Sequence, residues 1–291
     1  MINLSAHKGF KRILRGGGSR MALRDGKSRS YASHPAASDV SSYSFDGVDE
    51  YVHANGAAGA IDWDGSSSWS VSVWFKDAGT TAVPLYIWSA CSVTAATNRV
   101  MGISTFEAGG VGYVRFYGLT PSALTEATWS PVGGAGRIDV LATSPNGITP
   151  GDGNWHNVTL TVNTTASTAQ GVKMYLDGAL AGYAQSASAT IDWTKLVFGC
   201  RVQTNGAALD AFFPGDIHQA SIYGSELSAV SVAGLYNSGS PIDETTMSAV
   251  HFWRFGDGDS NGPSTLTDYG SGGADGTGVN LEAGDIVEAS P

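Results

Sequence analysis

A loop near the C-terminus carries residue types and spacing that suit a calcium site. Positions 1, 3, 5, 6 and 12 of one stretch are Asp257, Asp259, Asn261, Gly262 and Asp268. Carboxylate and amide oxygens wrap Ca²⁺ while the glycine permits a sharp turn. Aspartate at position 12 reaches less far than glutamate, and we expect no helix on either side. The same residues also suit a metal-free polar turn, so both interpretations stay open.

Other residues that could do chemistry are scattered along the chain. The six histidines form no close metal-ligand pair, and we expect Cys91 and Cys200 to be buried as small apolar residues rather than to act as a redox pair. Several tryptophans near expected loops could stack on sugars or else pack in the core or in an interface. They are Trp63, Trp88, Trp129 and Trp193.

The first 30 residues concentrate positive charge. They carry a net charge of +7, whereas the rest of the chain carries −17. The basic residues that we expect to contact a partner are Lys8, Lys11, Arg12, Arg15, Arg20 and Arg24. No apolar stretch follows them, so the segment is not a secretory signal, and it lacks the sustained apolar face of a membrane-surface helix.

These features predict an extended basic arm that becomes ordered on an acidic protein surface, including that of a neighbouring copy. A solvated tail is the alternative. Nucleic acid is a less favoured partner because only Phe10 and Tyr31 interleave the charges.

The chain from residue 43 alternates apolar and polar residues with the period of a β-strand. Clusters of glycine, asparagine, aspartate and serine separate the strands and explain the 39 glycines as turn residues. We expect strands at 69–76, 83–90, 111–117, 137–142, 155–162, 172–176, 196–200 and 216–223. One helix is expected over 225–237, with Leu227, Val230, Ala233 and Leu235 as its apolar residues, covering an edge or end of a sandwich.

Five motifs in this region resemble the laminin-G-like, concanavalin A-like jelly rolls. They are Ser44–Val52, Trp69–Lys76, Asp152–Val158, Lys173–Gly178 and the closing stretch 215–237. The resemblance implies an all-β, two-sheet antiparallel jelly-roll sandwich with one short helix. We expect Asp177-Gly178 to form a tight hairpin turn. We expect Phe45, Trp74, Trp155, Leu176 and Ile222 to lie in the core, with Trp155 between the sheets.

The C-terminal stretch also resembles this family, but stands in an unusual place. Residues 251–259 and 267–281 resemble a segment that begins the domain in many relatives. This order resembles laminin-G-like structural proteins of tailed bacteriophages. We therefore divide the chain into a basic arm (1–42), a jelly-roll domain (43–240) and a C-terminal strand and loop segment that packs on it (241–291).

Glucanases with this fold carry carboxylates on alternate residues of one strand, for acid and nucleophile roles. None of the seven glutamates stands in that pattern. We therefore expect a protein that is not an enzyme and that needs no cofactor other than the calcium considered above.

The preferred functional hypothesis is a virion structural protein, a capsid decoration or cement protein rather than a tail part. Its partners would be the major capsid protein or other virion subunits. We expect a homo-oligomer on the virion, made in the host cytoplasm, with no membrane contact. The alternative is a carbohydrate-binding adhesin or tail-fibre module.

Overall fold

A computed structural model places most of the chain after residue 40. It describes residues 41–54, 63–64, 68–79, 83–91, 100–108, 111–118, 137–141, 152–163, 171–184, 192–193, 195–203, 208–256, 262–288 and 291. The chain divides into two units, Met1–Ser38 and Asp39–Pro291. The first unit, with all six basic residues singled out above, lies outside the described residues.

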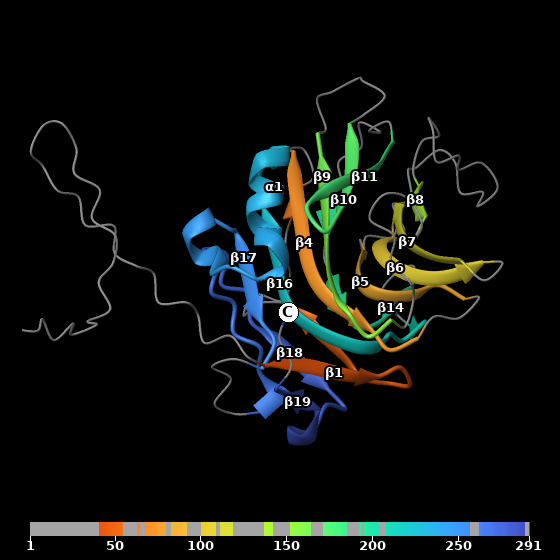
Figure 1. Ribbon diagram of the computed structural model, residues 1–291. Helices are drawn as coiled ribbons and strands as arrows, with labels where there is room; N and C mark the ends of the chain where they lie inside the picture. The colour runs from red at the N-terminus through yellow and green to blue at the C-terminus, as the bar shows by residue number, and fades with distance from the viewer. Residues whose placement is uncertain are drawn as a thin grey trace, which may run out of the picture. The chain divides into compact units, whose positions relative to one another are not determined.

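Two antiparallel sheets form the body (Figure 1). Sheet A contains, in spatial order, β11 (Ala179–Ala184), β10 (Val172–Leu176), β9 (Trp155–Val162), β4 (Trp69–Asp77), β16 (Pro214–Tyr223), β1 (Ser42–Asp46) and β19 (Ile286–Val287), and β17 (His251–Arg254) also pairs with β16. Sheet B contains β18 (Gly276–Val279), β2 (Tyr51–Ala54), β13 (Lys195–Phe198), β5 (Leu85–Cys91), β6 (Val100–Ala108), β7 (Val111–Gly118) and β8 (Arg137–Leu141). Two short ribbons pair β3 (Trp63–Asp64) with β12 (Asp192–Trp193), and β14 (Arg201–Val202) with β15 (Leu209–Asp210). This arrangement confirms the predicted two-sheet sandwich.

The core lies between the two sheets because alternate residues of each strand point inward. On β4 the inward residues are Trp69, Val71, Val73 and Phe75, all buried. On sheet B, Trp88 of β5 belongs to the same core and stands opposite Phe198 of the neighbouring strand β13. Burial of these large side chains is the main favourable term that holds the sandwich together.

The outer face of sheet A is also buried, although its residues are polar. Ser72, Asn157 and Thr159 are at most 1% exposed and hydrogen-bond one another. The chain after β16 covers this face, with helix α1 (Ala229–Tyr236) beside β11 (Figure 1). The ring of Tyr236 stacks on Trp74 at 5.7 Å. The helix therefore lies on a face of sheet A rather than at an edge or end of the sandwich.

The helix begins at its predicted serine cap, and its predicted apolar face is confirmed in part, because Leu235 is buried and Leu227 packs against the same cluster, whereas Val230 and Ala233 are exposed. Ser228 accepts a hydrogen bond from the Ser231 N–H, as an N-cap does. Val232 and Leu235 are buried, whereas Val230 is 83% exposed. Val232 and Leu235 stand three residues apart on the buried side of the helix, which leaves Val230 and Ala233 on the exposed side, so the prediction was wrong for these two residues.

Asp177 and Gly178 form the predicted tight turn between β10 and β11. Both have positive φ, at 50° and 75°. A two-residue hairpin turn with positive φ at both positions matches the right-handed twist of the flanking strands. The Asp-Gly prediction is therefore confirmed.

Trp155 was predicted to fill the space between the sheets, and the structure places it on the outer face of sheet A. Val158, Leu160 and Val162 point into the core, so odd-numbered residues of β9 point the other way. Trp155 is half-buried, with the Lys76 ammonium 5.3 Å from its ring centroid. Phe45, Leu176 and Ile222 lie in the core as predicted, and Trp74 is buried beneath Tyr236 rather than between the sheets.

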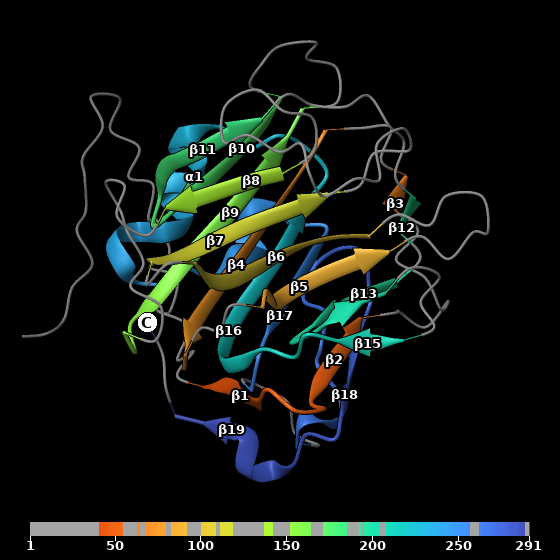
Figure 2. The same ribbon diagram turned by 90° about the vertical axis from the view of Figure 1, so that its right-hand side faces the viewer.

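The C-terminal stretch adds strands to both sheets. β17 pairs with β16, and β19 pairs with β1 in sheet A, whereas β18 pairs with β2 in sheet B. Residues 251–288 therefore close the ends of both sheets beside the first strands of the jelly roll (Figure 2).

Candidate functional site

The outer face of sheet B carries a stack of aromatic and arginine side chains, on the face viewed in Figure 2. Phe106 of β6 lies opposite Tyr113 of β7, and their rings stack with centroids 4.8 Å apart. The Arg115 guanidinium carbon lies 3.8 Å from the Phe106 ring centroid. Phe106 is only 7% exposed, whereas Tyr113 and Arg115 are half-buried. The buried ring thus supports two side chains that a ligand could reach.

A second cationic group lies on the same face, where the β14–β15 ribbon crosses sheet B. Arg201 donates from Nε and Nη2 to the two carboxylate oxygens of Asp210, at 2.7 and 2.6 Å. Gln203 donates to Asp210 at 2.6 Å, and the Arg201 guanidinium lies 5.6 Å from the Tyr86 ring centroid. Such a bidentate pair fixes both side chains in one geometry.

The pKa values of this pair favour its charged form. Hydrogen bonds from Arg201 and Gln203 hold the pKa of Asp210 below its usual range, and the bond to Asp210 raises the pKa of Arg201. A carboxyl group that protonates a glycosidic oxygen needs a raised pKa instead. Asp210 is therefore a permanent counter-ion and hydrogen-bond acceptor rather than a general acid.

Gly102 makes room for Tyr86 on this face. A Cβ atom there would lie 2.5 Å from the Trp88 carbonyl oxygen and 2.7 Å from Tyr86 Cδ1. The Tyr86 side chain is 3% exposed, and burial raises its pKa. Only glycine lets this ring lie across β6 at van der Waals distance.

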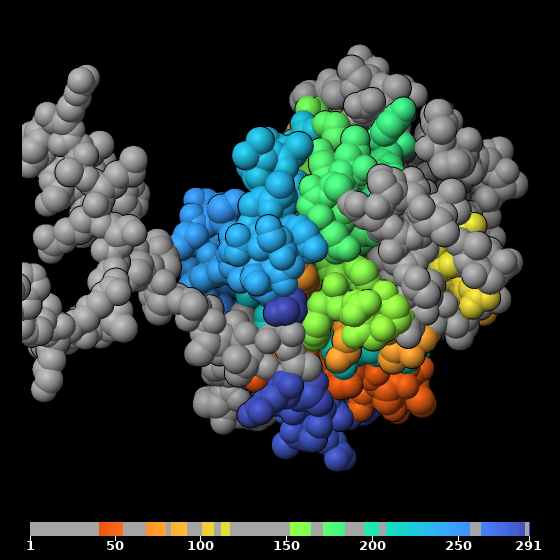
Figure 3. Space-filling view, in the orientation of Figure 1, coloured from red at the N-terminus to blue at the C-terminus, as the bar shows by residue number. Residues whose placement is uncertain are grey.

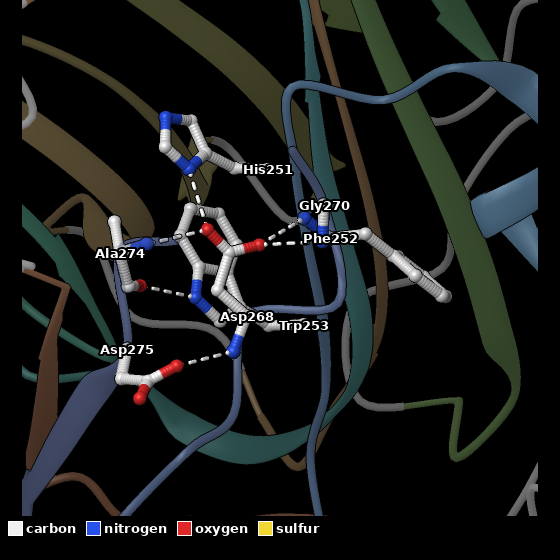
Figure 4. A network of polar contacts seen from close by, with 7 residues as sticks. All are labelled: His251, Phe252, Trp253, Asp268, Gly270, Ala274 and Asp275. Atoms are coloured by element: carbon white, nitrogen blue, oxygen red, sulfur yellow. Dashed lines mark hydrogen bonds and ion pairs between the residues drawn. The ribbon is translucent and has the colours of Figure 1, made fainter. Parts of the chain in front are cut away.

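Asp268, the last residue of the predicted calcium loop, is the centre of a hydrogen-bond network (Figure 4). One oxygen accepts from the backbone N–H groups of Phe252 and Gly270, at 2.9 and 2.8 Å. The other accepts from the backbone N–H of Ala274 and lies beside His251 Nδ1, both at 2.7 Å. Burial raises the pKa of Asp268, but these bonds outweigh it and hold the pKa below its ordinary value.

This network ties the C-terminal stretch to β17. The His251 ring stacks on Trp253 at 5.4 Å, and Trp253 Nε1 donates to the Ala274 carbonyl at 2.9 Å. Asp257, Asp259 and Asn261 lie outside the described residues, so the calcium site stays a prediction. Within the described part of the chain, no group of three histidine, cysteine, aspartate or glutamate side chains is arranged to hold a metal ion.

His156 forms a second histidine–carboxylate cluster, at the start of β9. Its Nδ1 lies 2.9 Å from Asp177 Oδ2 and its Nε2 lies 3.5 Å from Asp152 Oδ2. Burial lowers the pKa of His156, but the two carboxylates outweigh burial and raise it. The cluster joins the β9 entry to the Asp177-Gly178 turn, which gives it a structural role.

The structure describes three of the four tryptophans singled out from the sequence, and they lie in different surroundings. Trp88 is fully buried and lies opposite Ile103 and Phe198 in the core, so of its two interpretations, sugar stacking and core packing, the structure supports core packing. Trp63 and Trp193 stand directly opposite each other in the β3–β12 ribbon. Trp129 lies outside the described residues.

Both cysteines are free and buried, as expected for apolar core residues. Burial raises the pKa of Cys200 to about 12, so its thiol stays protonated at neutral pH.

Sequence reasoning missed the stack of Phe106, Tyr113 and Arg115. Its signal was present in the alternation of residues 111–117, where Tyr113 and Arg115 occupy the face opposite Val114 and Phe116. The β6 strand that carries Phe106 was not predicted, because Gly102, Ser104 and Thr105 weaken its apolar pattern.

The two sheets define a concanavalin A-like jelly roll. The family model described as the concanavalin A-like lectin/glucanases superfamily, of laminin-G type, matches residues 46–233, and the chain belongs to this family. No curated protein matches the chain. In the described part of the chain, no helix has the length and apolar character needed to cross a membrane.

Several solved structures are similar to the chain. One is a heptameric SAP-like pentraxin from Limulus polyphemus, with 12% identity, 68% of this chain and 82% of that chain covered, and a TM-score of 0.48. Another is the CBM40 of the Ruminococcus gnavus IT-sialidase, with 14% identity, 68% and 99% coverage, and a TM-score of 0.43. A third is domain 4 of a GH43 extracellular arabinanase from Geobacillus stearothermophilus in complex with arabinotriose, with 17% identity, 67% and 87% coverage, and a TM-score of 0.39.

Proposed function

We propose that this chain is a non-enzymatic recognition protein whose jelly-roll body binds a saccharide on the outer face of sheet B. The observation that supports the proposal is the stack of Phe106, Tyr113 and Arg115. An aromatic face packs against the C–H groups of a sugar ring, and a guanidinium donates hydrogen bonds to its hydroxyl or carboxylate oxygens. Asp210 and Gln203 of the neighbouring ribbon add fixed polar groups.

The test is a glycan array probed with the full chain, followed by titration of the best glycan. Tyr113→Ala and Arg115→Ala should each weaken binding by at least tenfold, because each removes a half-buried contact group. Val230→Ser, on the exposed side of α1, is the matched control and should bind as the wild type does. The proposal fails if the wild type binds no glycan, or if both variants bind it unchanged.

A second candidate function is supported by the charge segregation in the sequence. A virion structural protein of the capsid decoration or cement type would use the +7 arm as a connector to the major capsid protein or another subunit, and the −17 remainder as an outward domain. The phage-like order of the C-terminal motifs also favours this role. Ordering an arm of about 40 residues costs much conformational entropy, so the arm needs a large contact in return.

Deletion of residues 1–30 tests the second candidate. The truncated protein should no longer be incorporated into particles, whereas a variant with Lys8→Arg and Lys11→Arg, which keeps the charge, should be incorporated normally. Decoration of particles by the truncated protein would contradict the arm as connector.

A further inference from the structure

A lysine, an asparagine and a glutamate meet on the outer face of sheet A. Lys173 belongs to β10, Asn163 directly follows β9, and Glu226 lies in the segment between β16 and α1. Lys173 Nζ donates to Glu226 Oε1 at 2.6 Å. Asn163 Nδ2 donates to the other oxygen, Oε2, at 2.7 Å. One carboxylate therefore holds an amine and a carboxamide side by side, although 53 and 63 residues separate it from them.

The surroundings shield this triad from most of the solvent. The side chains of Lys173 and Glu226 are 25% and 24% exposed. Thr161, directly opposite Lys173 on β9, is fully buried, and Tyr175 on the next outward position of β10 is 5% exposed. Figure 3 shows the chain after β16, coloured cyan, beside the green surface of β10 and β11. Shielding restricts the motion of the three groups and strengthens their electrostatic interaction.

The backbone also holds Lys173 and Asn163 in a fixed relation. Lys173 pairs with Thr161 in the register of β9 and β10, and the Asn163 N–H donates to the Gly171 carbonyl at 2.7 Å. Asn163 lies just beyond β9 and two residues from Thr161, the partner of Lys173, so it is a diagonal neighbour of Lys173, and both side chains reach Glu226. Diagonal neighbours of this kind lie within reach of long side chains.

We propose that Lys173 and Asn163 form an intramolecular isopeptide bond, with Glu226 as the base that takes a proton from the lysine nitrogen and passes it on to the leaving nitrogen. The Lys173 ammonium, ion-paired with Glu226, first loses one proton to the solvent. The freed Nζ lone pair then attacks Asn163 Cγ and forms the Nζ–Cγ bond. Glu226 accepts the second proton from the lysine nitrogen and delivers it to Asn163 Nδ2, the Cγ–Nδ2 bond breaks, ammonia leaves, and the carboxylate is regenerated. No oxidant or other reactant is consumed.

The charge state of Glu226 suits the role of base. Burial raises its pKa, but the hydrogen bonds from Lys173 and Asn163 outweigh burial and hold the pKa below its ordinary value. An amine attacks a carbonyl only after it has lost a proton, so the bond forms faster as the pH rises. A nucleophile within hydrogen-bond distance of its base is the arrangement that such catalysis requires.

The bond would join the end of β9 to β10 across the connection of residues 164–170. A covalent cross-link restricts the unfolded chain, as a disulfide does. Because Glu226 lies just before α1, its hydrogen bonds to Lys173 and Asn163 also hold the segment before α1 against the outer face of sheet A.

Mass spectrometry of the full chain tests the proposal. After incubation at pH 9, the wild-type protein should be lighter by the mass of one ammonia molecule. Tryptic digestion should then give a branched peptide in which Lys173 is joined to Asn163. Asn163→Asp should release no ammonia from this site, because its carboxyl group carries no amide nitrogen.

Two variants separate this bond from other losses of ammonia, such as succinimide formation at Asn146-Gly147. Lys173→Arg keeps the charge and the ion pair but should give no branched peptide. Glu226→Gln should slow the reaction by about 100-fold or more, the usual contribution of general acid–base catalysis. Circular dichroism confirms that each variant is folded. The proposal is overturned if the folded wild type gives no branched peptide at pH 9, or if Glu226→Gln forms it at the wild-type rate.

Discussion

Glu244 provides the sharpest prediction, because it is a buried carboxyl group whose contacts include no cation. It lies in the 3₁₀ turn Glu244–Met247, is 1% exposed, and accepts a short hydrogen bond from the Tyr223 hydroxyl of β16. Arg254 of β17 pairs with Asp243 at 2.8 Å rather than with Glu244. Burial raises the pKa of Glu244 from 4.5 to about 7, and the neighbouring Asp243 adds to the rise.

The raised pKa makes the folded state bind a proton that the unfolded state releases. Below pH 4.5 both states are protonated, and Glu244 has no effect on pH dependence. Between pH 4.5 and 7 only the folded state keeps the proton, so the free energy of unfolding falls as the pH rises. The difference between the pKa values of the unfolded and the folded state corresponds to about 3 kcal/mol in the free energy of unfolding. This contribution is fully lost above pH 7.

Glu244→Gln removes this dependence, because the amide stays neutral and still offers an oxygen to Tyr223. Urea unfolding of both proteins from pH 4 to 8 measures the effect. The variant should match the wild type near pH 4 and be more stable by about 3 kcal/mol at pH 8. Glu50, whose pKa burial also raises to about 7, contributes equally to both proteins and cancels in the difference. A difference between the two proteins that stays constant from pH 4 to 8 would refute the reasoning.

Three further predictions follow from the same structure. Asp268→Asn should cost about 2–4 kcal/mol in urea unfolding, since one of its oxygens is replaced by a donor that faces buried donors; an unchanged midpoint would contradict the network. Gly102→Ala should cost about 1–3 kcal/mol, because its Cβ would lie 2.5 Å from the Trp88 carbonyl, whereas Gly79→Ala, with open space around it, should be near neutral. Calcium titration calorimetry should show no uptake, and chelator should leave the melting temperature unchanged, because both Asp268 oxygens already accept hydrogen bonds. Uptake that Asp257→Asn weakens by at least tenfold would contradict the metal-free turn.

The charge split, the strand periodicity and the turn chemistry could be read from the sequence. Period-2 alternation located eight of the nineteen described strands, including the three longest strands of sheet A, since each such strand buries one set of alternate residues. Asp177-Gly178 predicted its turn because few other pairs adopt positive φ at both positions. The ordered series of motifs from Ser44 to Asn237 indicated the family, which the match over residues 46–233 confirms.

Tertiary structure alone decided which face of sheet A points inward. Alternation shows which residues share a face, but both faces of this sheet are buried, so it could not tell that Trp74 and Trp155 lie on the outer face rather than between the sheets. The segment after β16, which includes α1, lies on the outer face of sheet A and buries it. The packing of this segment depends on contacts between residues far apart in the sequence.

Long-range packing also determined what the candidate functional side chains contact. Asp268 occupies a position in a calcium motif, yet two of its four hydrogen-bond partners lie in β17 and the other two lie in the loop that follows Asp268. The Glu226 carboxylate reaches Lys173 and Asn163 only because sheet A and the chain that covers it pack together. Local residue types determine what a side chain can do, and long-range packing determines what it meets.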